Sequence, residues 1–92
     1  IGGTVVGRGA EIGPGARLDG AVVFDGAVIE AGAVVERSIV GFGARLGPRA
    51  LVRDTVIGDG ADIGARCELL RGARVWPGVT IPDNGIRFSS DI

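Results

Sequence analysis

The chain has 92 residues, a length that permits one small domain. Its ten basic residues are balanced by eleven acidic ones, so the net charge of −1 gives no electrostatic footprint for nucleic acid or for a membrane surface. Hydrophobic residues make up 46% of the chain, which argues against disorder, yet only 4% are aromatic and eighteen are glycine. We therefore expect a core of small aliphatic side chains in thin layers.

Three further features bear on the setting of the chain. No apolar run approaches the length of a membrane-spanning helix, and no signal peptide opens the sequence. The single cysteine, Cys67, excludes an internal disulfide and fits a reducing compartment, so we expect a cytoplasmic protein. The sequence contains no Met, which indicates that residue 1 is either processed or part of a longer chain.

Taken in chain order, aliphatic residues recur in steps of 6, 6 and 5, three times over, and then in four steps of 6. The steps make a superperiod of 17 residues. A helix cannot keep such residues on one face, whereas short strands joined by tight turns can. The sequence therefore predicts an all-β, single-stranded parallel β-helix, a hexapeptide-repeat solenoid of about four and a half coils. The series comprises Val6, Ile12, Leu18, Val23, Ile29, Val35, Val40, Leu46, Val52, Ile57, Ile63, Leu69, Val75 and Ile81.

A second series of small or aliphatic residues lies four positions after the first, and we expect it to point inward as well. Cys67 belongs to it, in the column where other coils have Ala16, Ala33 and Ala50, which predicts a buried, inert thiol. The members are Ala10, Ala16, Val22, Ala27, Ala33, Ile39, Ala44, Ala50, Val56, Ala61, Cys67, Ala73 and Val79.

The corners of the predicted prism have their own pattern. One corner carries glycine in every coil, which predicts positive φ or a close backbone approach: Gly9, Gly26, Gly43, Gly60 and Gly78. The second corner uses Gly15 and Gly32 and then Arg49 and Arg66, so it tolerates a Cβ. Outward residues 17 apart become neighbours in stacked coils. This predicts an Arg37–Asp54–Arg71 column and the pairs Glu36–Arg53, Arg8–Asp25 and Arg45–Asp62.

The regular pattern stops near the C-terminus. Pro77 and Pro82 cannot donate hydrogen bonds to a further strand, and Asp83-Asn84-Gly85 is a turn signal. We therefore assign residues 1–82 to the β-helix and residues 83–92 to a C-terminal cap or tail.

No catalytic, cofactor-binding or metal site is predicted in the chain. The strings GRGAEIG, GFGARLG and GDGADIG repeat in consecutive coils and lack the dinucleotide spacing, which indicates a structural role. The absence of histidine removes the usual general base or metal ligand of enzymes built on such repeats. We instead expect a domain or subunit interface that includes Phe24, Phe42 and Trp76 near corners, Val34 and Leu51 on an apolar outward side shared with Val28, and Phe88 in the tail.

The whole chain resembles the C-terminal left-handed β-helix of sugar-phosphate nucleotidyltransferases, and the segments RVWPGVTIP and GIRFSSDI resemble the mannose-1-phosphate guanylyltransferases of actinobacterial type. The resemblance implies left-handed coiling, and it implies a parent enzyme with an N-terminal catalytic domain preceding residue 1. That enzyme would transfer GMP from GTP to mannose 1-phosphate with the help of Mg²⁺. The β-helix would contribute structure and homo-oligomer assembly. It would need no cofactor of its own.

Two alternatives remain open from the residues. The chain could be a stand-alone scaffold or binding solenoid without enzymatic activity. It could also belong to an enzyme for another sugar or nucleotide, such as a glucose-1-phosphate adenylyl- or thymidylyltransferase, because no residue of the β-helix is expected to contact substrate.

Overall fold

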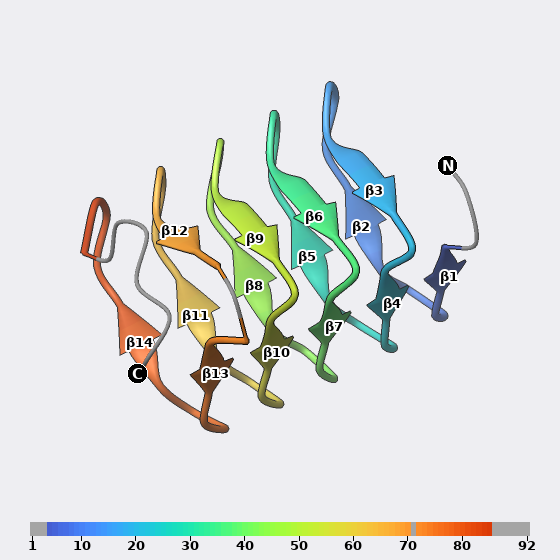
Figure 1. Ribbon diagram of the computed structural model, residues 1–92. Helices are drawn as coiled ribbons and strands as arrows, with labels where there is room; N and C mark the ends of the chain where they lie inside the picture. The colour runs from blue at the N-terminus through green and yellow to red at the C-terminus, as the bar shows by residue number, and fades with distance from the viewer. Residues whose placement is uncertain (1–3, 71, 86–92) are drawn as a thin grey trace.

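The computed structural model describes residues 4–70 and 72–85. Every regular element in this part of the chain is a short β-strand, and the strands wind around one axis as stacked coils (Figure 1). Each full coil contributes one strand to each of three sheets, and all strand pairs are parallel. The predicted all-β parallel solenoid is confirmed, with about four coils.

Each of the three sheets forms one side of the solenoid. Sheet A contains β1 (Val5–Val6), β4 (Val22–Val23), β7 (Ile39–Val40), β10 (Val56–Ile57) and β13 (Arg74–Val75). Sheet B contains β2 (Glu11–Ile12), β5 (Val28–Ile29), β8 (Arg45–Leu46), β11 (Asp62–Ile63) and β14 (Thr80–Ile81). Sheet C contains β3 (Arg17–Asp19), β6 (Val34–Glu36), β9 (Leu51–Arg53) and β12 (Glu68–Leu69).

The strand register follows the predicted superperiod. In sheet A, Val6 pairs with Val23, Val23 with Val40, and Val40 with Ile57. The next partner, Val75, lies one residue further along the chain than that period would place it. We number the coils 1 to 5 by these five residues, in chain order.

The first aliphatic series forms the core. Its members from Leu18 to Ile81 are buried along the solenoid axis. Val6 and Ile12 in coil 1 remain 47% and 39% exposed, although they occupy the same inward columns. They are exposed because, within the described residues, coil 1 has a stacked neighbour on one side only.

The prediction that the second series points inward is wrong on the short side of the prism. Val22, Ile39 and Val56 belong to sheet A strands but face outward. The buried small residue lies three positions after the preceding core residue here, because this side has one residue fewer in the first coils. The inward residues at this corner are Ala21, Ser38 and Thr55, whereas Ala73 in the last coil lies four positions after Leu69 and is buried as predicted.

Two of these inward residues carry hydroxyl groups, so the inward positions are not all apolar as the repeat suggested. The Ser38 hydroxyl donates to the Glu36 carbonyl oxygen at 2.8 Å and accepts from the Thr55 backbone N–H at 3.1 Å. The Thr55 hydroxyl lies 2.7 Å from the Arg53 carbonyl oxygen. Burial of these two polar groups is tolerated because both are hydrogen-bonded.

The predicted corners are confirmed. The glycine column has φ between 65° and 75°, a left-handed conformation that glycine adopts without steric cost. In the second corner Arg49 and Arg66 adopt φ of 62° and 59°, so this corner does accept a Cβ. Asn84 continues the second corner in the Asp83-Asn84-Gly85 turn, with φ of 57°.

Candidate interaction surface

The charged residues of sheets B and C pair with one another along the stack. Arg45 contacts Asp62 at 2.7 Å and Glu30 at 3.1 Å. Arg53 contacts Glu36 at 2.7 Å. These pairs confirm the Arg45–Asp62 and Glu36–Arg53 predictions. Exposed pairs of this kind contribute about 0–1 kcal/mol each, so their main effect is to fix register between coils.

Two further charge predictions have different outcomes. Asp25 does contact Arg8, but its carboxylate Oδ1 accepts from the backbone N–H of Arg8 at 2.9 Å, which makes the contact a corner cap. Asp59 caps the Phe42 N–H in the same way at 3.0 Å. Arg71, the predicted third member of the Arg37–Asp54 column, lies outside the described residues.

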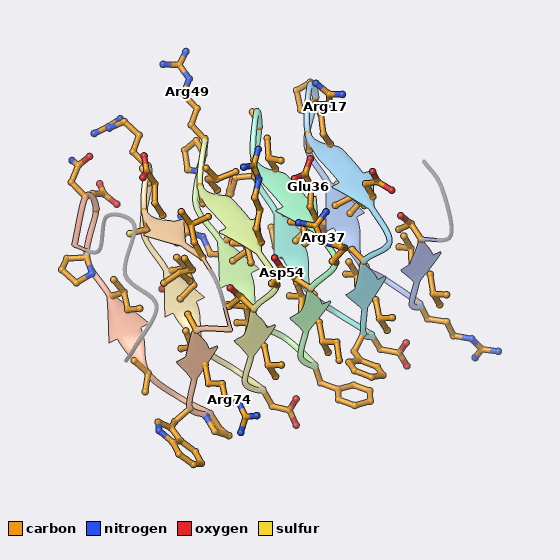
Figure 2. All side chains as sticks on the ribbon, viewed as in Figure 1. Arg17, Glu36, Arg37, Arg49, Asp54 and Arg74 are labelled. Carbon is orange, nitrogen blue, oxygen red and sulfur yellow. The ribbon has the colours of Figure 1, made fainter. Side chains whose placement is uncertain are left out.

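Arg37 and Asp54 form a two-pronged pair at the corner between sheets C and A (Figure 2). Arg37 Nε donates to Asp54 Oδ1 at 2.8 Å, and Nη2 donates to Oδ2 at 3.2 Å. The hydrogen bond from Arg37 holds the pKa of Asp54 below its ordinary value, and the charges of Arg37 and Arg53 act in the same direction. The pair therefore favours the ionised carboxylate.

Replacing Arg37 with Gln is expected to raise the pKa of Asp54 toward the ordinary aspartate value of about 3.9. A carboxylate whose folded-state pKa is depressed stabilises the fold above its unfolded-state pKa, and this stabilisation disappears as the pH falls through the folded-state value. The stability difference between the wild type and Arg37→Gln should therefore shrink below about pH 4. NMR titration of the Asp54 carboxyl and denaturant unfolding at several pH values measure the two effects.

A matched control for this change is Arg49→Gln. Arg49 occupies a similar left-handed corner, with φ of 62° against 49° for Arg37, and it makes no ion pair within the described chain. Its replacement should leave the pKa of Asp54 where it is. An equal shift in both variants would mean that the guanidinium of Arg37 does not set that pKa.

The predicted interface residues fall in two places. Val34 and Leu51 are half-buried neighbours in sheet C, where β6 and β9 pair them directly. Val28, expected on the same side, lies in sheet B, so these three residues do not form one face. Phe24, Phe42 and Trp76 all lie at the corner that follows sheet A, but only Phe24 and Phe42 stack, and Trp76 is three coils away from Phe24. Phe88 lies outside the described residues.

The outward residues of sheet A form the most apolar row on the described surface. Ile39 and Val56 are 40% and 43% exposed, and their neighbour Arg74 is the only charged member of the row. We call this set the apolar row. In order of coils it consists of Val5, Val22, Ile39, Val56 and Arg74.

A second row runs beside the first, one residue after the core position of each sheet A strand. Phe24 stacks on Phe42 from the neighbouring coil, with ring centroids 4.8 Å apart. Trp76 is 69% exposed, more than any other large hydrophobic side chain described. We call this set the aromatic–glycine row. In order of coils it consists of Gly7, Phe24, Gly41, Gly58 and Trp76.

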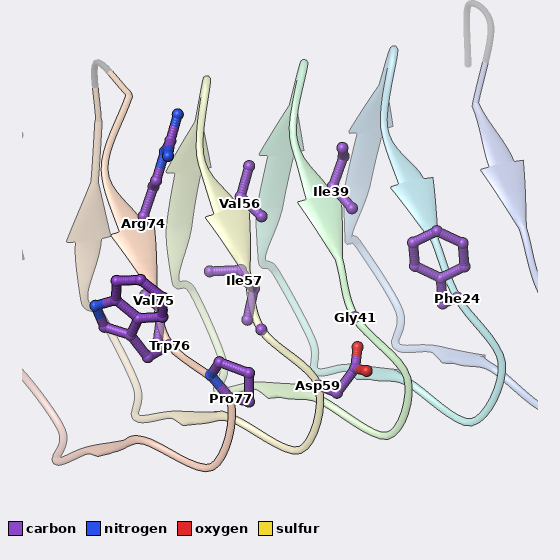
Figure 3. A pocket seen from close by; sticks show the side chains of 11 residues that line it. Phe24, Ile39, Gly41, Val56, Ile57, Asp59, Arg74, Val75, Trp76 and Pro77 are labelled. Carbon is purple, nitrogen blue, oxygen red and sulfur yellow. The ribbon is translucent and has the colours of Figure 1, made fainter.

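A groove of about 380 Å³ lies between the two aromatic ends of this row (Figure 3). Phe24 and Trp76 line its ends, and Gly41 and Gly58 line the stretch between them. Ile39 and Val56 of the apolar row also line it, together with Ile57, Asp59, Arg74, Val75 and Pro77. The lining is largely apolar, so the groove is suited to burying a hydrophobic side chain from another surface.

Sequence reasoning missed Ile39, Val56, Asp59 and Arg74 as parts of this surface. A step of four on all three sides predicts an interior position for Ile39 and Val56, whereas both side chains face outward. The signal that identifies their outward direction is the row of small residues one position earlier, which includes Ser38 and Thr55.

Two features of the described residues concern metal binding and membrane crossing. Within residues 4–70 and 72–85, no three His, Cys, Asp or Glu side chains gather closely enough to hold a metal ion. In the same part of the chain, there is no helix with the length and hydrophobicity needed to cross a membrane. Cys67 is buried as predicted, with its Sγ 3.3 Å from the Pro82 carbonyl oxygen.

Comparison with known proteins gives one family and one curated relative. A mannose-1-phosphate guanylyltransferase of Mycobacterium tuberculosis (strain ATCC 25618 / H37Rv) is 82% identical over 92 residues, which are 100% of this chain and 26% of the relative. The chain thus spans about a quarter of the length of that protein. No solved structure matches the chain. The family model described as the GMPPB C-terminal domain matches residues 1–89, so the chain belongs to the GMPPB C-terminal domain family.

Proposed function

We propose that this chain is the non-catalytic structural and assembly module of a mannose-1-phosphate guanylyltransferase. The observation that carries the proposal is the 82% identity to such an enzyme over the whole chain, which corresponds to only 26% of the relative. The all-strand solenoid supports a structural role, because each coil is held by its neighbours in one continuous stack.

In this proposal the chemistry belongs to another part of the parent protein. An N-terminal catalytic domain would transfer GMP from GTP to mannose 1-phosphate, giving GDP-mannose and pyrophosphate. The nucleotide, the sugar phosphate and Mg²⁺ would bind there. The pairing of Arg45, Arg53 and Arg37 with acids supports this division, because these guanidinium groups already have carboxylate partners on the solenoid surface. We also propose that the parent enzyme works in the cytoplasm.

The solenoid would serve the parent enzyme in two ways. Its sides provide an extended rigid surface for packing against the catalytic domain, and its exposed apolar row provides a surface for association between subunits. The stack of buried aliphatic residues from Leu18 to Ile81 supports rigidity, since every coil adds buried residues to one continuous core.

The test compares three proteins: the full-length parent, the parent without these 92 residues, and this chain alone. We expect the full-length protein to form GDP-mannose from GTP and mannose 1-phosphate, and this chain to form none. Removing the 92 residues should lower the oligomer mass measured by light scattering and lower the melting temperature. Turnover by this chain alone would contradict the proposal.

The same assay separates the alternatives. Full-length protein that uses glucose 1-phosphate with ATP or dTTP in preference to mannose 1-phosphate with GTP would assign the module to a different nucleotidyltransferase. A truncated parent with unchanged mass and stability would show that the module has no assembly role.

A further inference from the structure

The corner between sheets B and C carries two arginines in a backbone conformation that favours glycine. Arg49 and Arg66 have φ of 62° and 59°, and coils 1 and 2 use Gly15 and Gly32 at the same position. The two arginines are stacked, since the Arg66 N–H donates to the carbonyl oxygen of Pro48 in the preceding coil at 3.0 Å. We propose that Arg49 and Arg66 together bind a phosphate or diphosphate group. This site goes beyond the proposed function and does not depend on it.

The left-handed backbone of these arginines has a cost that glycine would avoid. At the corner between sheets C and A, the same conformation at Arg37 and Asp54 is accompanied by a two-pronged ion pair between the two side chains. Within residues 4–70 and 72–85, neither Arg49 nor Arg66 has a carboxylate at ion-pair distance. Backbone conformations of this kind that no ion pair offsets are concentrated at binding sites.

The two arginines also place like charges next to each other. Stacked coils lie about 4.8 Å apart, so guanidinium groups on neighbouring corners repel one another. By contrast, Arg45 meets Asp62 and Arg53 meets Glu36 in the neighbouring coil, so opposite charges pair in those columns. An anion bound beside both arginines would replace their repulsion with two attractive contacts.

A hollow on the surface lies beside the two side chains. Its volume is about 420 Å³, and none of its lining residues is acidic. Figure 2 shows Arg49 extending away from the ribbon. Arg66 Nε donates to Asn84 Oδ1 at 3.1 Å, and this bond leaves the two Nη groups of Arg66 for another acceptor. The lining residues are Pro14, Ala31, Gly32, Pro48, Arg49 and Arg66.

The charge and shape of the two guanidinium groups select the class of ligand. A planar guanidinium binds phosphoryl oxygens through two parallel hydrogen bonds. Two arginines match about two negative charges, which a phosphate monoester or a diphosphate supplies in one group and a single carboxylate does not. The other lining side chains are apolar, so they offer no partner to the hydroxyl groups of a sugar or to the edge of a base. The recognised group is therefore the phosphate itself.

Binding at this corner should be weak and sensitive to salt. Both arginine side chains are exposed, and their backbone N–H groups already donate to carbonyl oxygens of the preceding coil at 3.0 Å each. The side chains alone therefore supply the donors. We expect a dissociation constant on the order of 1 mM for pyrophosphate at low salt, rising as the ionic strength increases.

The first experiment titrates the chain with sodium pyrophosphate at constant ionic strength and follows the arginine Nε–H signals by NMR. The signals of Arg49 and Arg66 should move and saturate, while those of Arg45 and Arg53 should stay. Arg49→Gln with Arg66→Gln should raise the dissociation constant at least about tenfold, because charge-assisted hydrogen bonds are lost. The matched control, Arg45→Gln with Arg53→Gln, removes the same number of charges and should leave the constant unchanged.

A second pair of variants guards against a loss of structure. Arg49→Gly with Arg66→Gly gives coils 3 and 4 the same corner residue that coils 1 and 2 have in Gly15 and Gly32. Circular dichroism should show wild-type strand content for this pair, and its affinity for pyrophosphate should fall as far as that of the glutamine pair. Wild-type affinity in the folded glycine pair would exclude the site.

Three further probes distinguish the sources of the phosphate group. Inorganic phosphate, mannose 1-phosphate and GDP-mannose carry it as a free ion, on a sugar and on a nucleotide sugar. Similar affinity for pyrophosphate and GDP-mannose would identify the free group as sufficient. Tighter binding of one phosphorylated metabolite, lost in the Arg49→Gln and Arg66→Gln pair, would assign that metabolite as the source.

Three results would overturn the inference. The first is the absence of a saturable shift at Arg49 and Arg66, and the second is an equal loss of affinity in the Arg45→Gln and Arg53→Gln control. The third is tighter binding of the dicarboxylate succinate than of pyrophosphate, which would show that the corner instead docks acidic side chains of another protein. These measurements use the 92-residue chain and involve no turnover, so none of the three results would contradict the guanylyltransferase assignment.

Discussion

Replacing Gly58 with Ala is expected to destabilise the chain by about 3 kcal/mol or more, the upper range for overpacked sites. A Cβ added at Gly58 would lie 2.4 Å from the backbone N of Pro77 and 2.7 Å from the backbone C of Trp76. These atoms belong to the backbone of the next coil, so no change of rotamer can relieve the contact. The coils would have to separate where the Gly58 N–H donates to the Val75 carbonyl oxygen at 2.7 Å.

The matched control is Gly60→Ala, two residues further along the same coil. Gly60 has φ of 70°, and an added Cβ there would meet no atom within 4 Å. The expected loss is about 1–2 kcal/mol, from the left-handed backbone alone. Arg49 and Arg66 show that this fold accommodates L-residues in that conformation. Urea unfolding of both variants measures the difference, and equal losses would show that the close approach of the coils does not determine the effect.

The architecture could be predicted from the sequence because one pattern encodes it many times. Steps of 6, 6 and 5 place an aliphatic residue on the inner face of every strand, and the observed register from Val6 to Val23, Val40 and Ile57 follows that spacing. The charge pairs follow from the same period, since Arg45 and Asp62 are adjacent in stacked strands. A feature repeated in each coil can be identified even when a single instance is ambiguous.

The candidate interaction surface could not be predicted in the same way, because it depends on what differs between coils. The short side changes the step to the inward residue from four to three, so Ile39 and Val56 turn outward and Ser38 and Thr55 turn inward. The stacking of Phe24 on Phe42 runs diagonally between columns, so it depends on ring rotamers as well as on the period. The groove arises only where Gly41 and Gly58 follow Phe24 in one row, a spatial relation that needs the corner geometry.

The position of a residue in the stack should affect stability as much as its type does. For this reason Ile63→Ala is expected to lower the free energy of unfolding by about 2–5 kcal/mol. Ile63 in β11 is fully buried, and its partners in the sheet are Leu46 on one side and Ile81 on the other. Removing its side chain leaves a cavity that coils on both sides cannot readily fill, because the strands of each coil are fixed by parallel hydrogen bonds.

The same substitution at Ile12 provides the comparison. Ile12 occupies the same inward column of sheet B but is 39% exposed, with Ile29 as its only sheet partner among the described residues. Ile12→Ala should lower the free energy of unfolding by about 1 kcal/mol or less, because part of the side chain is already in water. Denaturant unfolding of the two variants tests whether burial between neighbouring coils determines stability. Equal losses would instead indicate that coil 1 is packed on both faces in solution.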